Sequence, residues 1–421
     1  MIDGIPQYIQ RDRLENDIIQ NAEFGKVPVE SGHARTVLTG TEPNKQVREY
    51  FIDRLVEAGL DVRVDAVGNI AGRWIPQTAD PNAPAVATGS HLDSVPRGGI
   101  FDGVLGVYGA LEAVRALQDA DVSLRRPIDV VCFTEEEGAR FSDGVLGSAV
   151  ATGQRSVDDA LSLEAENGTT LEESLAAIGF HGDGRLDASA WDSWLEIHIE
   201  QNDRLETVDV PLGVVTTITG TVRLQIEIIG EANHSGSTKM SERQDALAAA
   251  SEIVLDLEAA TSEAVERYGD TVVGTAGKLD VEPNAINVVP GKVELGIDVR
   301  DIEYASMEYI IGEVKKELSR IEQERGVVTT FKRPYDIEPI SMSDRCIHAL
   351  STAAETAGIE SIELHSGAGH DTMHVAKVTE SGLIFAPSHN GISHSPMEWT
   401  EWCDCVAATQ VLASALAKLA H

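Results

Sequence analysis

The feature that most constrains the fold and the function of this chain is a polar loop between a predicted buried strand and a glycine-containing helix. Residues 85–88 (Ala-Val-Ala-Thr) are predicted to form the strand and residues 104–117 the helix, with His91, Asp93 and Asp102 between them. In open α/β sheets, ligands bind outside the carboxyl ends of strands, so this loop is a candidate site. A histidine nitrogen beside carboxylate oxygens suits zinc, manganese or cobalt. The alternative is a polar loop in which the histidine only caps a neighbour.

Size and composition indicate a soluble globular protein of two domains. A chain of 421 residues exceeds what one hydrophobic core usually serves, and 42% hydrophobic with 24% charged residues is typical of globular proteins. Neither a signal-peptide core nor a membrane-spanning apolar stretch is recognisable, so we expect no membrane association and a cytoplasmic location. The cysteines follow no disulfide or zinc-ribbon pattern and are expected to be reduced: Cys132, Cys346, Cys403 and Cys405.

The net charge is strongly negative. Lysine and arginine number 33 against 69 aspartate and glutamate, which gives a formal charge of −36. Nucleic acid is excluded as a ligand because polyphosphate requires a basic surface. The acidic residues are spread along the whole chain, which argues against a disordered acidic tail. We interpret this as a halophilic acidic surface adapted to high salt, with a moderately acidic mesophilic enzyme as the alternative.

Strand and helix patterns predict an α/β fold with an inserted second domain. Short strands alternate with helices up to about residue 133, which favours a sheet with parallel members. From residue 213 the order becomes strand, helix, strand, strand, helix, strand, which is the ferredoxin-like arrangement. The predicted fold is therefore a mixed, largely parallel sheet domain, residues 1–212 and 331–421, with an inserted ferredoxin-like α+β domain, residues 213–330.

Three adjacent carboxylates, Glu135, Glu136 and Glu137, follow the predicted strand at residues 127–133. Adjacent carboxylates repel one another, so the cluster is costly unless a cation shares it. A solvated acidic turn would explain this segment taken alone. Its position at the same sheet edge as His91 favours a metal ligand next to a group that takes a proton from water.

Histidines occur in three further segments. His198 lies in an alternating strand, where a lone histidine is more often structural. A turn-rich loop carries His389 and His394, and composition does not select between them as a ligand. His370 and His374 are spaced as in a helical zinc site, but a third ligand is not apparent, so His374 is treated as structural.

Taken together, these blocks resemble the hydantoinase/carbamoylase amidohydrolases, a group of the aminoacylase- and carboxypeptidase-like metallopeptidase clan. The group contains N-carbamoyl-L-amino acid hydrolase, allantoate amidohydrolase and β-ureidopropionase. The resemblance runs from about Gly32 to the end of the chain, in at least seven blocks in matching order. It implies two divalent metal ions, with zinc expected and manganese, cobalt or nickel as alternatives. The implied ligands are His91 and His198 for one ion, Glu137 and His394 for the other, and Asp102 as the bridge.

The resemblance also implies catalytic and substrate-binding residues. Glu136 resembles the general base, and Asp93 resembles the carboxylate that orients a histidine ligand. His234, in the block Asn-His-Ser-Gly, is implied to polarise the scissile carbonyl, and Gly369 presents a main-chain amide to substrate. The remaining implied substrate contacts are Gln201, Asn287, Arg300 and His370. An arginine fork suits a carboxylate, although an ion pair of Arg300 with Asp298 or Asp301 is the structural alternative.

The expected function is metal-dependent hydrolysis of a linear amide or ureido bond in a small carboxylate substrate. Candidates are N-carbamoyl amino acids, β-ureidopropionate and allantoate, among which the sequence does not choose. The resemblance further implies that the inserted domain acts as a lid and forms a homodimer. An aminoacylase or dipeptidase of the same clan is the first alternative. A non-catalytic ligand-binding relative is the second, and the presence of every implied ligand and of the base argues against it.

Overall fold

The computed structural model describes residues 2–141 and 144–421, which form two compact units. The first unit comprises the chain up to Ile218 and again from Ser341, and the second comprises Thr219–Ile340. The sequence placed these boundaries at 212/213 and 330/331. They shift because strand β8 (Gly213–Ile218) pairs within the first unit, whereas β14 (Val328–Ile337) belongs to the second.

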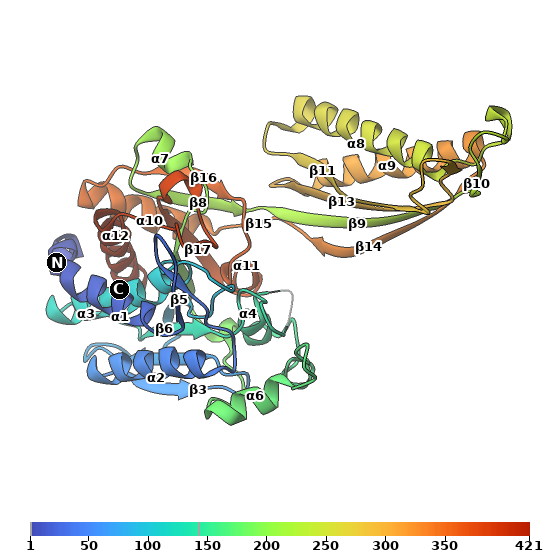
Figure 1. The fold of residues 1–421 in the computed structure, drawn as a ribbon. Coiled ribbons are helices and arrows are strands. Elements are labelled where there is room, and N and C mark those ends of the chain that lie inside the picture. The colour runs from blue at the N-terminus through green and yellow to red at the C-terminus, as the bar shows by residue number, and fades with distance from the viewer. Residues whose placement is uncertain (1, 142–143) are drawn as a thin grey trace. The chain divides into compact units, whose positions relative to one another are not determined.

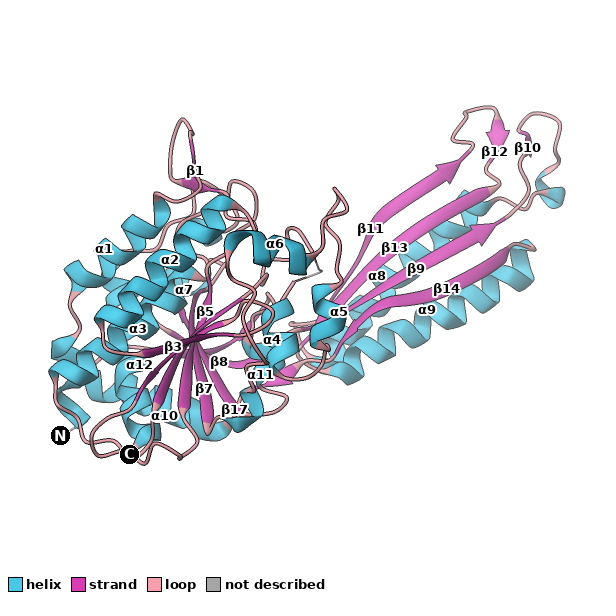
Figure 2. Cartoon of the chain, turned by 90° about the horizontal axis from the view of Figure 1, so that it is seen from below, coloured by secondary structure: helices cyan, strands magenta, loops and turns pink. Residues whose placement is uncertain are grey.

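A nine-stranded mixed sheet forms the centre of the first unit. Its order is β15-β8-β17-β7-β5-β6-β4-β3, with β16 paired to β8. Helices lie on both sides of these strands (Figure 2). Parallel pairs join β5 to β6 and β7, and β7 to β17, whereas β3, β4 and β6 pair antiparallel. The other strands span Asp61–Val64 (β3), Ile70–Trp74 (β4), Val86–His91 (β5), Ile128–Phe133 (β6), Ser193–Ile199 (β7), Ile340–Ser341 (β15), Ile362–Ser366 (β16) and Glu380–Ala386 (β17).

Helices cover both faces of this sheet, and its central strands β5, β6 and β7 are buried on both sides. On one face α3 (Val104–Asp119), α10 (Asp344–Ala357) and α12 (Trp402–Ala420) pack together. Leu195 and Ile197 of β7 join their core, and Trp194 joins a second core. The other helices of this unit are α1 (Arg11–Ala22), α2 (Glu42–Glu57), α4 (Leu146–Ala151), α5 (Val157–Leu161), α6 (Leu171–Ile178), α7 (Arg204–Val208) and α11 (Thr372–Val375).

The parallel register brings the carboxyl ends of β5, β6 and β7 to one edge of the sheet. His91 is the last residue of β5, and it pairs with Phe133 at the end of β6. The carboxylates of residues 135–137 follow directly, and His198 lies near the end of β7. Parallel pairing therefore gathers side chains that are far apart in the sequence, as expected at such an edge.

Helix α12 passes the length and composition test for a membrane span, contrary to the expectation from sequence. About two thirds of its apolar window, 67%, is buried inside the structure. It packs against α3 and α10, with Val411, Leu412 and Leu416 fully buried. Helix α12 is therefore apolar because it packs in the core of the first unit.

The second unit is a four-stranded antiparallel sheet with two helices. Along the chain the order is β9 (Gly220–Ile229), α8 (Ala246–Tyr268), β11 (Val273–Glu282), β13 (Lys292–Asp301), α9 (Tyr304–Arg325) and β14. In space the strands lie in the order β11-β13-β9-β14. Both helices lie on one face of the sheet (Figure 1). Burial alternates along β9 and β13 because only that face is covered.

Candidate metal centre

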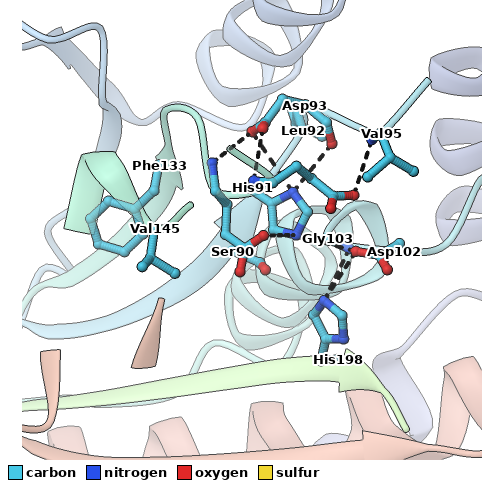
Figure 3. Close-up of polar contacts among 12 residues, drawn as sticks. Ser90, His91, Leu92, Asp93, Val95, Asp102, Gly103, Phe133, Val145 and His198 are labelled. Atoms are coloured by element: carbon cyan, nitrogen blue, oxygen red, sulfur yellow. Dashed lines mark hydrogen bonds and ion pairs between the residues drawn. The ribbon is translucent and has the colours of Figure 1, made fainter. Parts of the chain in front are cut away.

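Two groups of possible metal ligands share one carboxylate. His91 Nε2 and His198 Nε2 lie 3.3 and 3.4 Å from Asp102 Oδ1 (Figure 3). The other oxygen, Oδ2, lies 3.4 Å from His394 Nε2, which is 3.3 Å from Glu137 Oε2. In each group the ligand atoms all lie within 4.8 Å of one another. Asp102 thus faces both groups, one with each oxygen.

The histidine nitrogens of the first group suit a metal ion. His91 Nδ1 lies 3.2 Å from the carbonyl oxygen of Asp93, and His198 Nδ1 lies 2.9 Å from that of Ile199. These contacts assign the ring protons to Nδ1, which leaves both Nε2 atoms as acceptors beside Asp102. His198 Nε2 accepts from the Gly103 amide at 3.3 Å. His91 Nε2 is buried without a hydrogen-bond partner. Nitrogen and carboxylate donors of this kind fit zinc, manganese, cobalt or nickel.

Gly103 allows the loop to bring Asp102 against His91. Its φ of 68° lies in the left-handed region, and a Cβ there would come 2.4–2.5 Å from ring atoms of His91. Any side chain at this position would therefore displace the ring. The glycine also precedes α3 as its N-cap. Local backbone geometry thus sets the distance between the two candidate ligands.

Glu136 lies beside the first group without belonging to either. Its Oε2 atom is 3.5 Å from His91 Nε2. Burial raises the pKa of Glu136 well above its ordinary value; nearby Asp371 and Glu137 raise it further, and His91 lowers it. A carboxyl group whose pKa is raised in this way is a stronger base than an exposed glutamate, as a group that accepts and returns a proton requires.

Asp93 and Glu135 fix the loop that carries Glu136. We expected the Asp93 carboxylate to orient His91, but it lies 3.8 Å from the ring, and the closer contact comes from the Asp93 carbonyl oxygen. The carboxylate instead accepts hydrogen bonds from the amides of Glu136 and Glu137 at 3.3 and 3.1 Å. Glu135 is buried and accepts two amide hydrogen bonds at 2.7 Å, from residues 140 and 141. It is therefore an anchor of the turn, not a solvated acid.

The charges of the second group, which consists of Asp102, Glu137 and His394, favour a bound cation. Burial, followed by the Asp102 carboxylate, raises the pKa of Glu137 to about 7. A hydrogen bond to Asp102 raises the pKa of His394 to about 9. Burial opposes ionisation of Asp102, yet His198, His394 and His91 hold its pKa well below the usual value. A divalent ion held between these ligands would supply positive charge that keeps the carboxylates ionised.

Other predicted site residues of the first unit lie around these groups. Gln201 donates from Nε2 to Asp102 Oδ2 at 2.7 Å, and its Oε1 is buried without a partner. His370 is buried, with Nε2 2.9 Å from Ser366 Oγ and its ring 4.5 Å from that of His198. Burial and His198 lower its pKa well below the usual value. Gly369 lies in the same loop after β16. His374 contacts Gln154 instead, and His389 contacts Glu206.

The remaining predicted residues belong to the second unit. His234 lies in β10 (Asn233–His234), which pairs with β12 (Val288–Val289). Its Nδ1 accepts hydrogen bonds from the amides of Gly236 and Ser237, at 3.0 and 3.2 Å, so the proton is assigned to Nε2. Asn287 is exposed, and its main-chain carbonyl oxygen accepts a hydrogen bond from the Ser235 amide at 3.0 Å. Arg300 makes the ion pair with Asp298 that we named as its structural alternative, at 2.7 Å.

Comparison with known proteins identifies the family. Residues 87–418 match the peptidase family M20/M25/M40. The chain is 37% identical over 418 residues to an N-carbamoyl-L-amino acid amidohydrolase of Geobacillus stearothermophilus, covering 98% of this chain and 99% of the relative. It is 34% identical to a ureidoglycolate hydrolase of Arabidopsis thaliana, covering 96% and 86%. A hydantoinase/carbamoylase family amidase from Burkholderia multivorans superposes with a TM-score of 0.88, at 33% identity and 98% coverage of both chains.

The chain belongs to the M20/M25/M40 peptidase family. Within it, the similarities confirm the resemblance to the hydantoinase/carbamoylase group.

Three residues near the centre of this M20 protein were not identified from sequence. They are Arg35, Ser393 and Glu398, and each contacts the segment that ends at Asp102. Glu398 contacts a residue 296 positions away, and the four acceptors of Arg35 among the described residues are all main-chain oxygens. Neither kind of contact leaves a local pattern in the sequence. The position of Glu398 four residues after His394 was the one signal available.

Proposed function

We propose that the protein is a metal-dependent amidohydrolase that cleaves a linear amide or ureido C–N bond in a small carboxylate substrate. The observation that carries this is Asp102, shared by two ligand groups, with Glu136 beside them and outside both. The relatives named above support the reaction class. Two divalent ions are proposed, with zinc as the expected metal.

The proposed ligands follow the two groups. His91 and His198 would hold one ion, Glu137 and His394 the other, and Asp102 would join both. When bound, such ions lower the pKa of water and polarise a carbonyl oxygen. Glu136 would take the proton from water and return it to the departing nitrogen, because it lies next to the ligands without being one.

Substrate recognition is assigned to residues of both units. Arg300 and Asn287 would bind the substrate carboxylate, and His234, protonated on Nε2, would donate to the scissile carbonyl. Arg223 also contacts Asp298, at 3.2 Å, so Arg300 could release that carboxylate for a substrate. The buried, unpartnered Oε1 of Gln201 is a candidate acceptor for a substrate amide. Asp93 is a positioning residue, and Gly369 and His370 complete the proposed pocket.

The second unit is proposed to act as a lid and to form a homodimer, and the protein to work in the cytoplasm without a nucleic-acid or membrane partner. N-carbamoyl amino acids, β-ureidopropionate, allantoate and ureidoglycolate remain as substrates, because all share a ureido group and a carboxylate. Ureidoglycolate is added by the Arabidopsis relative and was not among the expectations from sequence.

The test compares two neighbouring glutamates. Glu136→Gln should abolish turnover of the preferred ureido substrate while retaining the metal content of the wild type, because only the base is lost. Glu135→Gln is the matched control, since Glu135 accepts main-chain hydrogen bonds from residues 140 and 141 and belongs to neither ligand group. Metal content is measured by elemental analysis after dialysis. Rates are measured on the four ureido compounds and on an N-acetyl amino acid.

Each outcome has a defined meaning. Retained turnover in Glu136→Gln would show that another group is the base. A faster reaction with the N-acetyl compound than with every ureido compound would favour the aminoacylase alternative. A folded wild type that binds metal but hydrolyses none of the compounds would favour a binding protein.

A further inference from the structure

The segment between His91 and Asp102 is held from one side by a fully buried arginine. Arg35 donates from Nε to the carbonyl oxygen of Gly99 at 3.1 Å and from Nη1 to that of Leu92 at 2.9 Å. Its Nη2 reaches the carbonyl oxygens of Asp93 and Asp102 at 3.5 and 3.4 Å. One guanidinium thus fastens both ends of the segment that separates two proposed ligands.

A buried carboxylate holds the same segment by its amides. Glu398 Oε1 accepts from the amides of Phe101 and Asp102 at 2.9 and 3.1 Å. Its Oε2 lies 3.0 Å from Ser393 Oγ, which in turn lies 2.8 Å from Asp102 Oδ2. Glu398 is 1% exposed. A Cβ at Gly99 would come 2.2 Å from its carboxylate, so only glycine allows this approach.

These two side chains hold Asp102 at its carbonyl oxygen (Arg35) and at its amide (Glu398), and the Ser393 hydroxyl, whose one proton can go to either carboxylate, lies between those of Asp102 and Glu398. The opposite charges of Arg35 and Glu398 offset part of the cost of burying each. The peptide and the carboxylate of Asp102 are therefore fixed together. Rotation of the carboxylate would break the Ser393 contact, and a shift of the backbone would break the others.

We infer that Arg35 and Glu398 are positioning residues that aim the two oxygens of Asp102 at the two ligand groups. The inference rests on the proposed function, because it presupposes that Asp102 joins two ions. Loss of either side chain should weaken the ion held at Oδ2 most. That oxygen faces His394, whose side chain is 49% exposed, whereas the histidines that face Oδ1 are 1% and 2% exposed. Side chains that orient metal ligands change metal affinity by about 10–100-fold.

The test is a cobalt(II) titration of metal-free protein, followed by visible absorption and by elemental analysis. Glu398→Ala, Arg35→Met and Ser393→Ala should each bind the first ion and lose about 10–100-fold in affinity for the second. Glu398→Gln should recover most of that loss, because its side-chain oxygen can still accept from both amides and its NH₂ can reach Ser393. Arg13→Met is the control: it disrupts a charge pair with buried Glu112 that makes no contact with residues 91–102.

The outcomes separate the two claims without an activity assay. A wild type that binds fewer than two ions would overturn the proposed binuclear site itself. A wild type that binds two ions, with unchanged second-site affinity in Glu398→Ala and Ser393→Ala, would overturn only this inference. Equal impairment of Glu398→Gln and Glu398→Ala would also overturn it. Ser393→Ala, which removes one hydroxyl, keeps the test decisive if the larger changes prevent folding.

Discussion

At the scale of single residues, the geometry of the candidate metal centre depends on the residues around the ligands as well as on the ligands themselves. Gly103 has no Cβ, and the His91 ring occupies the space where one would be. The two histidines of the first group use Nδ1 for main-chain oxygens, so Nε2 is the atom left for an ion. The polypeptide around the ligands therefore decides which ligand atom faces the centre.

Gly103→Ala tests this dependence. The added methyl group would displace the His91 ring, so we expect metal affinity to fall about tenfold or more. Gly59→Ala is the matched control, because Gly59 has a similar φ of 76° and nothing lies within 4 Å of its Cβ position. It should cost about 1 kcal/mol of stability through backbone strain alone and leave metal binding intact. Equal metal affinity in the two variants, by cobalt titration, would contradict the explanation.

At the scale of elements, the sequence predicted the order of strands and helices better than their partners. The buried run before His91 was predicted as residues 85–88 and is β5, Val86–His91. Its apolar start is recognisable by composition, whereas its end, Ser90 and His91, is polar yet buried and was assigned to the loop. The insert was predicted to start at residue 213, because β8 leads directly into β9 along the chain. Pairing of β8 with β16 and β17 assigns it to the first unit, and such long-range pairing leaves no local pattern.

The candidate site was likewise predictable in part: local patterns indicated some of its residues, whereas long-range contacts left no signal. The resemblance to a family supplied the ligand set, whereas local pattern alone left His389 and His394 equivalent. The structure separates them, since His394 lies beside Glu137 and His389 pairs with Glu206 at 2.8 Å. Arg35 and Glu398 could not be found, because their role lies in main-chain contacts across long sequence separations. Side chains that bind backbone give no pairing signal in a single sequence.

The partly buried ion pair between helices α1 and α3 gives a prediction at the scale of elements. Glu112 of α3 is fully buried and accepts from Arg13 of α1 at 2.6 and 2.9 Å, with Arg115 3.8 Å away. Arg13→Met leaves that carboxylate with only the Gln10 amide, at 2.8 Å, and the more distant Arg115 among the described residues, so we expect a loss of roughly 3 kcal/mol in the free energy of unfolding. Denaturant unfolding measures it. The double change Arg13→Met with Glu112→Leu should recover much of the loss, since it removes the buried charge; no recovery would contradict the explanation.

At the scale of the whole molecule, the excess of acid is not explained by the metal centre. Sixty-nine acidic residues face 33 lysines and arginines, so 36 negative charges have no basic counterpart in the chain. The centre uses only a few carboxylates. Most of the others are on the surface, where they repel one another at low salt.

Salt should therefore stabilise the protein by screening this repulsion. The Debye length falls from about 10 Å at 0.1 M salt to about 3 Å at 1 M, so the thermal midpoint should rise steeply in potassium chloride over this range and then flatten. Sucrose is the control, because it strengthens burial by exclusion without screening charge. A midpoint that is flat below 1 M, or that rises equally in sucrose, would show that charge repulsion does not limit stability. The moderately acidic mesophilic interpretation would then stand, since a surface adapted to high salt is defined by its response to ions.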